Sequence, residues 1–445
     1  MATTQRTVLR GLAAAAALGL MLSACTTDDG DENGGTAEGC EAFADYQEHD
    51  GTTVTIFTPI TEPESTDYEA SWDEFERCTG ITISYEGTDQ FEEQLRVRAQ
   101  GGNPPDLAFI PQPGVIAEMA AGGFAVPAPA EVQTLAETNW AAGWTDYSTV
   151  DGTFYGAPMS ANMKSLVWYS PTYFQENGYE IPQTWDELLA LTDEIAGTGI
   201  KPWCAGIESD AATGWPATDW VEDLFLRLNG VEVYQQWIDH QIPFNDPQVV
   251  AAFDAVGQIL KNPDYVNGGL GDVSSIATTS FEDAGLPILD EECAMHRQAS
   301  FYGAQWGDAT VAEDGDVYAF YFPVVDPAGP SPVLGGGEFV VAFADRPEVV
   351  AVQTYLATGE YATARAEQGA WASANNQVPV ETYTDPVFRL VAETMQDPEA
   401  QFAFDASDLM PGEIGGDYLF SQITEWIVGQ ATQTTVDNVE SNWPA

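Results

Sequence analysis

The chain has 445 residues, enough for two domain-sized lobes, and a formal net charge of −57, with 70 Asp and Glu residues against 13 Lys and Arg. This charge excludes proteins that bind nucleic acids or anionic membranes by electrostatic attraction, because both of those partners are negatively charged. The acidic residues are spread along the chain, and such a surface repels itself unless salt screens it. We therefore expect adaptation to a saline habitat.

Residues 1–24 have the pattern of a secretory signal. Arg6 and Arg10 precede an apolar run over 11–22 that is too short to span a bilayer. The run ends on Leu22-Ser-Ala-Cys25, which resembles the lipobox of bacterial lipoproteins, in which the Cys is lipidated. An ordinary signal peptide with a coincidental Cys is the alternative. We expect a mature body with a charge of about −59 from eleven basic and 70 acidic residues. Cys25 and a flexible acidic linker over 25–49 would tether it to the outer face of the cytoplasmic membrane.

Alternating strands and helices are predicted directly after this linker. Strand, helix, strand, helix, strand is the order typical of a parallel sheet covered by helices. In open α/β sheets, ligands bind at the carboxyl ends of the strands, and Pro111-Gln-Pro-Gly114 breaks the chain at this end of the third strand. The second of the expected elements has Tyr68, Trp72 and Phe75 at helical spacing. In chain order, the expected elements are 53–57, 67–78, 80–85, 91–100 and 106–110.

The remaining chain mixes both kinds of element, and no internal repeat is visible. Thr184 is expected to cap a helix, because Asp186 and Glu187 follow it in the first turn. The expected helices are 182–196, 218–240 and 247–260, with helices dominating from 347 to the end. The expected extended segments are 164–169, 292–301, 317–322 and 339–342.

Several motifs in their order resemble the extracytoplasmic sugar-binding proteins of ABC importers, the maltose-binding-like class, and within it the α-glucoside-binding lipoproteins. The resemblance covers about residues 50–445. It is carried by Gly102-Asn-Pro-Pro-Asp-Leu-Ala-Phe109, Asn162-Met-Lys-Ser-Leu-Val-Trp-Tyr169, Pro182-Gln-Thr-Trp-Asp-Glu-Leu188, Pro202-Trp-Cys-Ala-Gly-Ile-Glu-Ser209, Thr213-Gly-Trp-Pro-Ala-Thr-Asp-Trp220, Ala294-Met-His-Arg-Gln-Ala-Ser-Phe301, Leu334-Gly-Gly-Gly337 and Asp405-Ala-Ser-Asp-Leu-Met-Pro411.

The resemblance implies a two-lobed α/β periplasmic-binding-protein fold with a hinge that the chain crosses more than once. Lobe 1 would comprise 50–161 and 319–362, and lobe 2 would comprise 162–318 and 363–445. It implies a monomeric carrier that captures a neutral α-glucoside, such as maltose, trehalose or sucrose, between the lobes. The carrier would deliver this oligosaccharide to the membrane permease, without a cofactor of its own.

Five cysteines are an odd number for a secreted chain, and lipidation of Cys25 would leave four. Four cysteines allow three pairings. We favour Cys40 with Cys78 and Cys204 with Cys293, because each pair would fall inside one expected lobe. A metal site is not expected, because no two of these cysteines are close in sequence and the chain has only three His.

A sugar site needs aromatic plates for the apolar faces of the ring and converging polar groups for its hydroxyls. The class places a stacking aromatic at the Gly-Trp-Pro turn, which here presents Trp215, and a second one at Phe301. Packing of these rings in the core is the alternative, and Trp306 is a weaker candidate.

The polar candidates come from the same motifs. Lys164 and Arg297 are basic residues in a chain that has few, and charged donors form strong hydrogen bonds. Structural salt bridges are the alternative for both. Gln112 has an amide that could bridge two hydroxyls or could be a solvated turn residue, and Gly336 could allow close backbone approach or serve a flexible turn. The further polar candidates are Asn162, Asp210, Asp219 and Asp408.

Two other function classes compete with a carrier. An exported glycoside hydrolase acting on α-glucosides would need a pair of carboxylates, which 70 acidic residues cannot exclude. However, the Gly-x-Ser-x-Gly and His-Glu-x-x-His signatures are absent, and so are P-loop and dinucleotide fingerprints. A structural or adhesive surface lipoprotein would fit the anchor but not the α/β pattern. We therefore expect a binding protein and not an enzyme.

Overall fold

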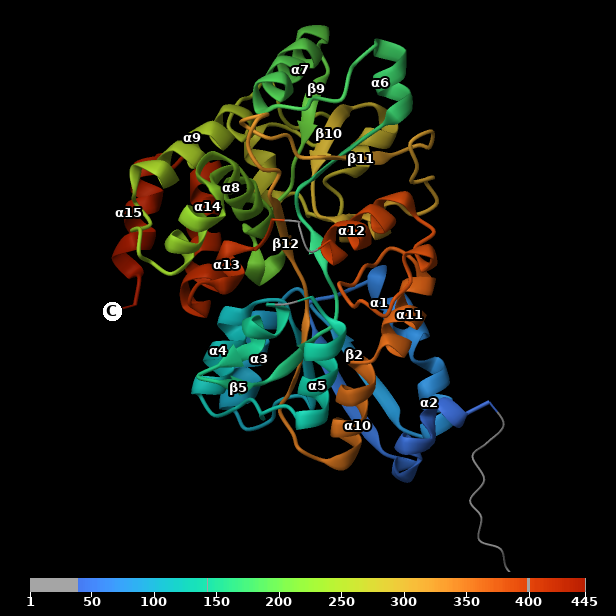
Figure 1. Cartoon of the computed structure of the whole chain (residues 1–445). Helices are drawn as coiled ribbons and strands as arrows, with labels where there is room; N and C mark the ends of the chain where they lie inside the picture. Colours follow the sequence, from blue (N-terminus) through green and yellow to red (C-terminus); the bar gives the residue numbers. More distant parts are fainter. Residues whose placement is uncertain (1–38, 142, 398–400, 445) are drawn as a thin grey trace, which may run out of the picture. The chain divides into compact units, whose positions relative to one another are not determined.

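The computed structural model describes residues 39–141, 143–397 and 401–444. The expected signal segment, Cys25 and most of the expected linker lie outside the described residues. From Phe43 onward the chain forms one α/β unit with two lobes (Figure 1). Among the described residues, no helix is both long enough and apolar enough to cross a bilayer.

The first lobe is built on a five-stranded sheet in the order β2-β1-β3-β13-β6. β1 (Thr53–Thr58) pairs in parallel with β2 (Thr82–Gly87) and β3 (Leu107–Ile110), which confirms the predicted parallel arrangement. β13 (Phe339–Ala342) is antiparallel to β3 and to β6 (Gly156–Pro158). The helices near this sheet are α1 (Glu64–Ser71), α2 (Asp73–Thr79), α3 (Phe91–Gln100), α4 (Pro113–Ala121), α5 (Ala130–Asn139), α10 (Pro347–Leu356) and α11 (Gly359–Gln368).

The second lobe is built on a four-stranded sheet in the order β11-β8-β10-β9. The strands are β8 (Leu166–Tyr169), β9 (Lys201–Cys204), β10 (Cys293–Arg297) and β11 (Tyr318–Tyr321). β11 pairs with β8 along its whole length, although the predicted boundary placed 319–321 in the first lobe. The other lobe boundaries remain predictions. The remaining helices are α6 (Pro171–Asn177), α7 (Trp185–Thr198), α8 (Trp215–Ile238), α9 (Pro247–Leu260), α12 (Pro386–Gln396), α13 (Ala406–Leu409), α14 (Leu419–Ile427) and α15 (Thr432–Asn442).

A small third sheet joins segments that are far apart in the sequence. It has the order β14-β12-β7 and consists of β7 (Asn162–Met163), β12 (Val333–Gly336) and β14 (Phe402–Phe404). Figure 1 shows β12 in the middle of the molecule, between the two larger sheets. The chain thus passes between the lobes more than once, as the fold class predicted. A short hairpin of β4 (Thr149–Val150) and β5 (Thr153–Phe154) completes the strands of the described residues.

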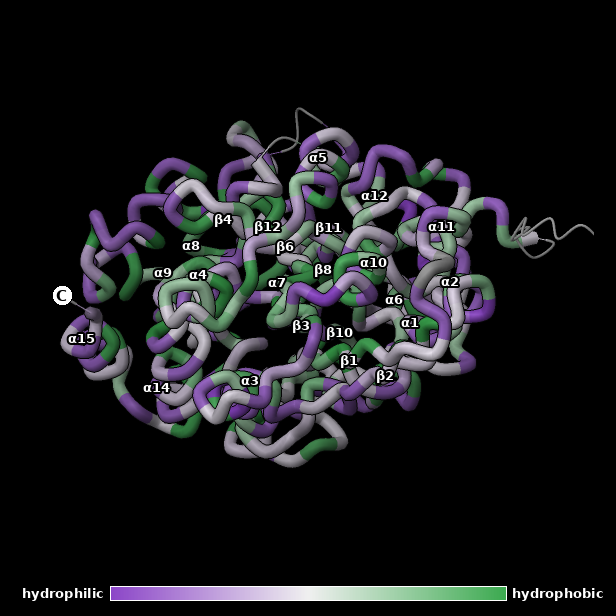
Figure 2. The backbone as a smooth tube through the Cα atoms, turned by 90° about the horizontal axis from the view of Figure 1, so that it is seen from below, coloured by the Kyte–Doolittle hydropathy of each residue, from purple (hydrophilic) through white to green (hydrophobic). Residues whose placement is uncertain are grey.

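Hydrophobic burial explains this layering. The strands β3, β8 and β13 are buried along their whole length, and they carry almost only apolar side chains. In Figure 2, apolar stretches lie at central strands such as β1 and β8, whereas hydrophilic stretches lie on outlying helices such as α15. Each buried Leu, Ile, Val or Phe side chain contributes about 1.5–3 kcal/mol to folding, so the sheets hold the pocket-forming loops in place.

Local sequence signals set the bounds of several helices. The side chain of Thr184 accepts from the backbone N–H of Glu187, and the Glu187 carboxylate accepts from the backbone N–H of Thr184, which forms a capping box at the start of α7. The predicted cap is therefore confirmed. The predicted bounds of α3 and α9 coincide with those in the structure.

The prediction of a single helix over 67–78 is wrong, because the chain breaks at Trp72. Its backbone has φ −117° and ψ 8°, and α1 and α2 lie on either side of it. The Ser71 hydroxyl donates to the carbonyl of Tyr68 at 2.6 Å, which competes with the helical ladder. Tyr68, Trp72 and Phe75 are nevertheless all buried, as their spacing indicated.

The predicted disulfide between Cys204 and Cys293 is confirmed. It links the neighbouring parallel strands β9 and β10, with the two Cα atoms 5.8 Å apart and both residues buried. Cys40 and Cys78 are also each disulfide-bonded.

Candidate ligand-binding site

A pocket of about 1060 Å³, its open mouth included, lies between the two lobes. Residues 59–61 follow β1, Asp89 follows β2, and Gln112 follows β3, so one wall is built at the carboxyl ends of three parallel strands. The other walls come from the second lobe and from segments next to the third sheet. They include Asn162, Lys164, Ser209, Ala212, Trp215, Phe281, Glu282, Phe301, Gln305, Gly336, Gly337, Glu338, Asp405, Ser407, Asp408 and Phe420.

Three aromatic rings form a corner of the pocket, which we call the aromatic corner: Trp215, Phe281 and Phe301. The Trp215 ring centroid lies 5.0 Å from that of Phe281 and 5.9 Å from that of Phe301. The rings are tilted against one another, at 67° and 51°, and each remains partly exposed. Such a corner offers apolar faces in two orientations to a bound ring.

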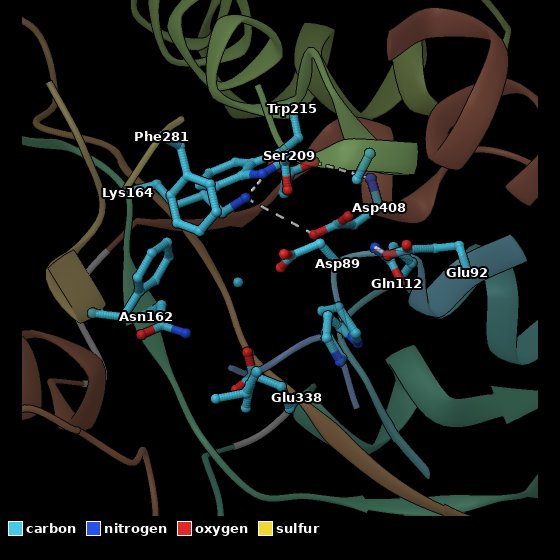
Figure 3. A pocket seen from close by; sticks show the side chains of 18 of the residues that line it. Asp89, Glu92, Gln112, Asn162, Lys164, Ser209, Trp215, Phe281, Glu338 and Asp408 are labelled. Atoms are coloured by element: carbon cyan, nitrogen blue, oxygen red, sulfur yellow. Dashed lines mark hydrogen bonds and ion pairs between the residues drawn. The ribbon is translucent and has the colours of Figure 1, made fainter. Parts of the chain in front are cut away.

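The start of α8 places Trp215 in this corner. Trp215 is the first residue of the helix, and Gly214 caps it with φ +124°. A Cβ atom at Gly214 would lie 2.4 Å from the carbonyl oxygen of Phe420, so only glycine fits there. The predicted turn is therefore a helix start, and it directs the indole toward the pocket (Figure 3).

Lys164 is held at the pocket surface by carboxylates from distant parts of the chain. Its Nζ lies 3.0 Å from Asp219 Oδ1, 2.6 Å from Asp405 Oδ2 and 4.0 Å from Asp408 Oδ2. Burial alone would lower the pKa of the Lys164 ammonium, but Asp219 and Asp405 raise it well above its ordinary value. Lys164 is therefore a permanent cation, and its charge is already compensated.

Arg297 and Asp219 lie behind Lys164 and do not line the pocket. Arg297 is buried, with its Nη2 atom 3.0 Å from Asp223 Oδ2 and its Nη1 atom 3.7 Å from Asp219 Oδ2. Burial raises the pKa of Asp219 to about 7, although Lys164 and Arg297 oppose this shift. Arg297 and Asp219, which were expected to contact the ligand directly, are therefore not among the residues that line the pocket. Asp219 pairs directly with Lys164, and Arg297 pairs with Asp219 and Asp223, which is the structural salt bridge that was the alternative for Arg297.

Two other candidates also lie outside the pocket lining. Asp210 is exposed in the short helix η3 (Asp210–Ala212), and it is not among the lining residues. Trp306 is buried against Trp168 and Tyr302, with ring centroids 5.7 and 5.1 Å away, so it belongs to the core. The structure brings together the seven remaining predicted residues around one pocket: Gln112, Asn162, Lys164, Trp215, Phe301, Gly336 and Asp408.

The wall opposite the aromatic corner is rich in carboxyl groups that the sequence analysis missed. Burial raises the pKa of Glu64 to about 8 and that of Glu338 to about 7. Burial also raises the pKa of Glu92, whose Oε1 accepts from Gln112 Nε2 at 2.8 Å. Figure 3 shows Glu338 across the pocket from Trp215 and Phe281. Several of these groups can therefore donate as well as accept hydrogen bonds.

Part of this wall could have been predicted from the rule that ligands bind at the carboxyl ends of strands, which the sequence analysis applied only to the third strand. Asp89 and Glu92 follow β2, as Gln112 follows β3, so the argument from the carboxyl ends of strands extends to them. No signal in the sequence marks Phe281, which lies in an irregular segment.

This geometry defines a class of protein: two α/β lobes that the chain joins repeatedly, with a polar and aromatic pocket between them. The sequence matches the family described as bacterial extracellular solute-binding protein over residues 59–368. The chain belongs to this family. It is therefore an extracytoplasmic binding protein and not an enzyme.

Relatives and solved structures agree with this assignment. The chain is 35% identical over 415 residues to the alpha-glucosides-binding periplasmic protein AglE of Rhizobium meliloti, covering 91% of this chain and 89% of the relative. It is 37% identical over 410 residues to the osmoprotective compounds-binding protein GgtB of Synechocystis, covering 91% and 96%.

Two solved structures share the fold. The bacterial solute receptor AcbH has a TM-score of 0.76 and 19% identity, covering 88% of this chain and 98% of that one. Maltose-bound MalE3 of T. maritima has a TM-score of 0.67 and 16% identity, covering 88% and 99%.

Proposed function

We propose that this protein is the substrate-binding component of an ABC importer for a neutral α-glucoside, such as maltose, trehalose or sucrose. The aromatic corner facing a wall of carboxyl and amide groups carries this proposal. The rings supply apolar faces for the C–H faces of a sugar, and the wall supplies partners for its hydroxyls. The name of AglE, an alpha-glucosides-binding protein that is similar to this chain over most of its length, favours the same ligand class.

The mechanism follows from the placement of the two walls. Gln112, Asp89 and Glu92 follow strands of the first lobe, whereas Trp215 and Phe301 belong to the second. A ligand that contacts both walls favours the closed arrangement by the difference in its affinity for the closed and open states. The closed complex would then dock on the permease, and a micromolar Kd, about −8 kcal/mol, would still allow release.

Isothermal titration calorimetry on residues 26–445 tests this function. The panel is maltose, trehalose, sucrose, maltotriose and glucose, in about molar salt to screen the acidic surface. We expect saturable one-to-one binding of at least one α-glucoside, which is recovered intact. If no sugar of the panel produces binding heat, and circular dichroism shows that the protein is folded, the proposed substrate class is refuted.

The proposed location includes a lipid anchor on Cys25, which would keep the protein near the permease. Two or more acyl chains anchor durably, whereas one does not. A Cys25→Ser variant of the full chain should move from the membrane fraction to the soluble exported fraction. An unchanged distribution would exclude the anchor and leave the binding function untouched.

A further inference from the structure

We propose that the pocket selects its ligand by charge and prefers glucosides carrying a protonated amino group over their neutral parents. This inference rests on the proposed function, the binding of a glucoside in this pocket, and concerns the charge of the glucoside that binds most tightly. The region concerned is the acidic end of the pocket around Asp89, between Glu92 and Glu282. All three line the pocket: Asp89 and Glu92 follow β2, and Glu282 comes from a distant part of the chain.

The residues that line the pocket carry many more acidic groups than basic groups. Lys164 is the only base among its lining residues, against the acids Glu64, Asp89, Glu92, Glu282, Glu338, Asp405 and Asp408. The ammonium of Lys164 is already paired with Asp219 and Asp405. Among the described residues, no Lys, Arg or His nitrogen lies within 4.0 Å of a carboxylate oxygen of Asp89, Glu92 or Glu282. Within the described part of the chain these three carboxyl groups therefore have no ion-pair partner, and a cationic ligand could supply one.

At this end of the pocket, two side-chain donors are already used in hydrogen bonds, whereas some acceptor atoms are not. Gln112 Nε2 is committed to Glu92, and the Thr61 hydroxyl is committed to Glu282 at 3.2 Å. The Oε1 atom of Gln112, a residue only 6% exposed, has no hydrogen-bond partner in the described part of the chain. The side-chain donors of Gln112 and Thr61 at this end of the pocket are thus committed, while acceptor atoms remain free. An ammonium group has three donors and no acceptor, whereas a hydroxyl brings one donor and also acceptor lone pairs.

The carboxylates near Asp89 also favour the binding of a cation there. Burial raises the pKa of Asp89, and the nearby carboxylates of Asp210 and Glu208 raise it further. Burial likewise raises the pKa of Glu282, with Asp89 and Glu208 contributing. Mutual repulsion is relieved when a cation binds among these groups.

The location of the amino group follows from the position of Lys164. Like charges repel, so the ligand ammonium should face Asp89 and not the Lys164 side of the pocket. Asp210 is exposed and does not line the pocket, but its carboxylate raises the pKa of Asp89, so its charge would also attract cationic ligands.

Titration calorimetry with matched ligand pairs tests the inference: trehalose against its 2-, 3-, 4- and 6-amino derivatives, and glucose against glucosamine and glucuronate. At a pH where the amines are protonated, at least one amino derivative should bind about tenfold more tightly than its parent. Glucuronate should bind more weakly than glucose. The preference should shrink in molar salt and at acidic pH, where Asp89 becomes protonated.

An Asp89→Asn variant should lower the ratio of the amino-derivative affinity to the parent affinity by about tenfold. Asp314→Asn, which removes an exposed charge outside the pocket lining, should leave this ratio unchanged. If every amino derivative binds no more tightly than its parent, the inference is wrong, while binding of the parent would leave the proposed function standing. Binding of amino derivatives without their parents would refute the neutral substrate and support selection by charge. Binding of neither would refute both.

Discussion

Trp215 offers the sharpest test of the aromatic corner. The side chain is partly exposed in the pocket, next to Phe281 and Phe301, and a bound sugar ring could cover one indole face. A Trp buries about 150–250 Å² when fully covered, so covering about a third of it at about 25 cal/mol per Å² contributes about 1–2 kcal/mol. Specific ring contacts can add about 1 kcal/mol. Trp215→Ala should therefore weaken α-glucoside binding by about 1–3 kcal/mol, or about 5- to 150-fold in Kd.

The assay is titration calorimetry of Trp215→Ala and Trp215→Phe, each checked by thermal unfolding. Trp215→Phe keeps an aromatic face and should lose less affinity than Trp215→Ala. Trp443→Ala is the matched control, because Trp443 is also partly exposed but stacks on His240 outside the pocket, with ring centroids 4.2 Å apart. The control should bind like the original protein. Unchanged affinity in Trp215→Ala, with the protein folded, would remove Trp215 from the site.

Three further predictions concern stability. Lys164→Met should cost about 3–5 kcal/mol in urea unfolding, because it leaves Asp219 and Asp405 buried without their cation. Lys201→Met, at a partly exposed lysine without a carboxylate partner among the described residues, should cost less than about 1 kcal/mol, and equal losses would contradict this account of the network. The raised pKa of Glu338, about 7, means that the folded state holds a proton that the unfolded state releases near 4.5. The free energy of unfolding should therefore fall as the pH rises from about 5 to about 7. Glu338→Gln should flatten that decline, and an identical pH profile in the variant would exclude Glu338 as a cause. Finally, the melting temperature should rise steeply as NaCl reduces the Debye length from about 10 Å at 0.1 M to about 3 Å at 1 M, and a flat profile would argue against saline adaptation.

The sequence predicts most of the fold because local patterns determine it. The alternation of buried strands and helices over residues 53–110 predicts the parallel sheet, and the capping box at Thr184 is a signal within four residues. The break at Trp72 was not predictable from spacing alone. It depends on three large side chains that all reach the core: Tyr68 from α1, Phe75 from α2 and Trp72 from the break between the two helices.

The candidate site was predictable only where a motif or a strand end marks a residue. Trp215 and Phe301 are 86 positions apart in the sequence, yet both line the aromatic corner. Phe281 completes that corner without any local signal. Arg297 and Asp219 have the residue types of a binding site, but their burial behind Lys164 depends on packing between α8 and β10. In a chain with 70 acidic residues, composition cannot show which carboxyls gather around one pocket.

The most direct test of the central claim is a crystal structure of the protein with the α-glucoside that binds most tightly in calorimetry. We predict a sugar ring against Trp215, Phe281 or Phe301, with its hydroxyls within hydrogen-bonding distance of Gln112 and the neighbouring carboxyls. A sugar bound outside this pocket, or packed away from the aromatic corner, would contradict the account.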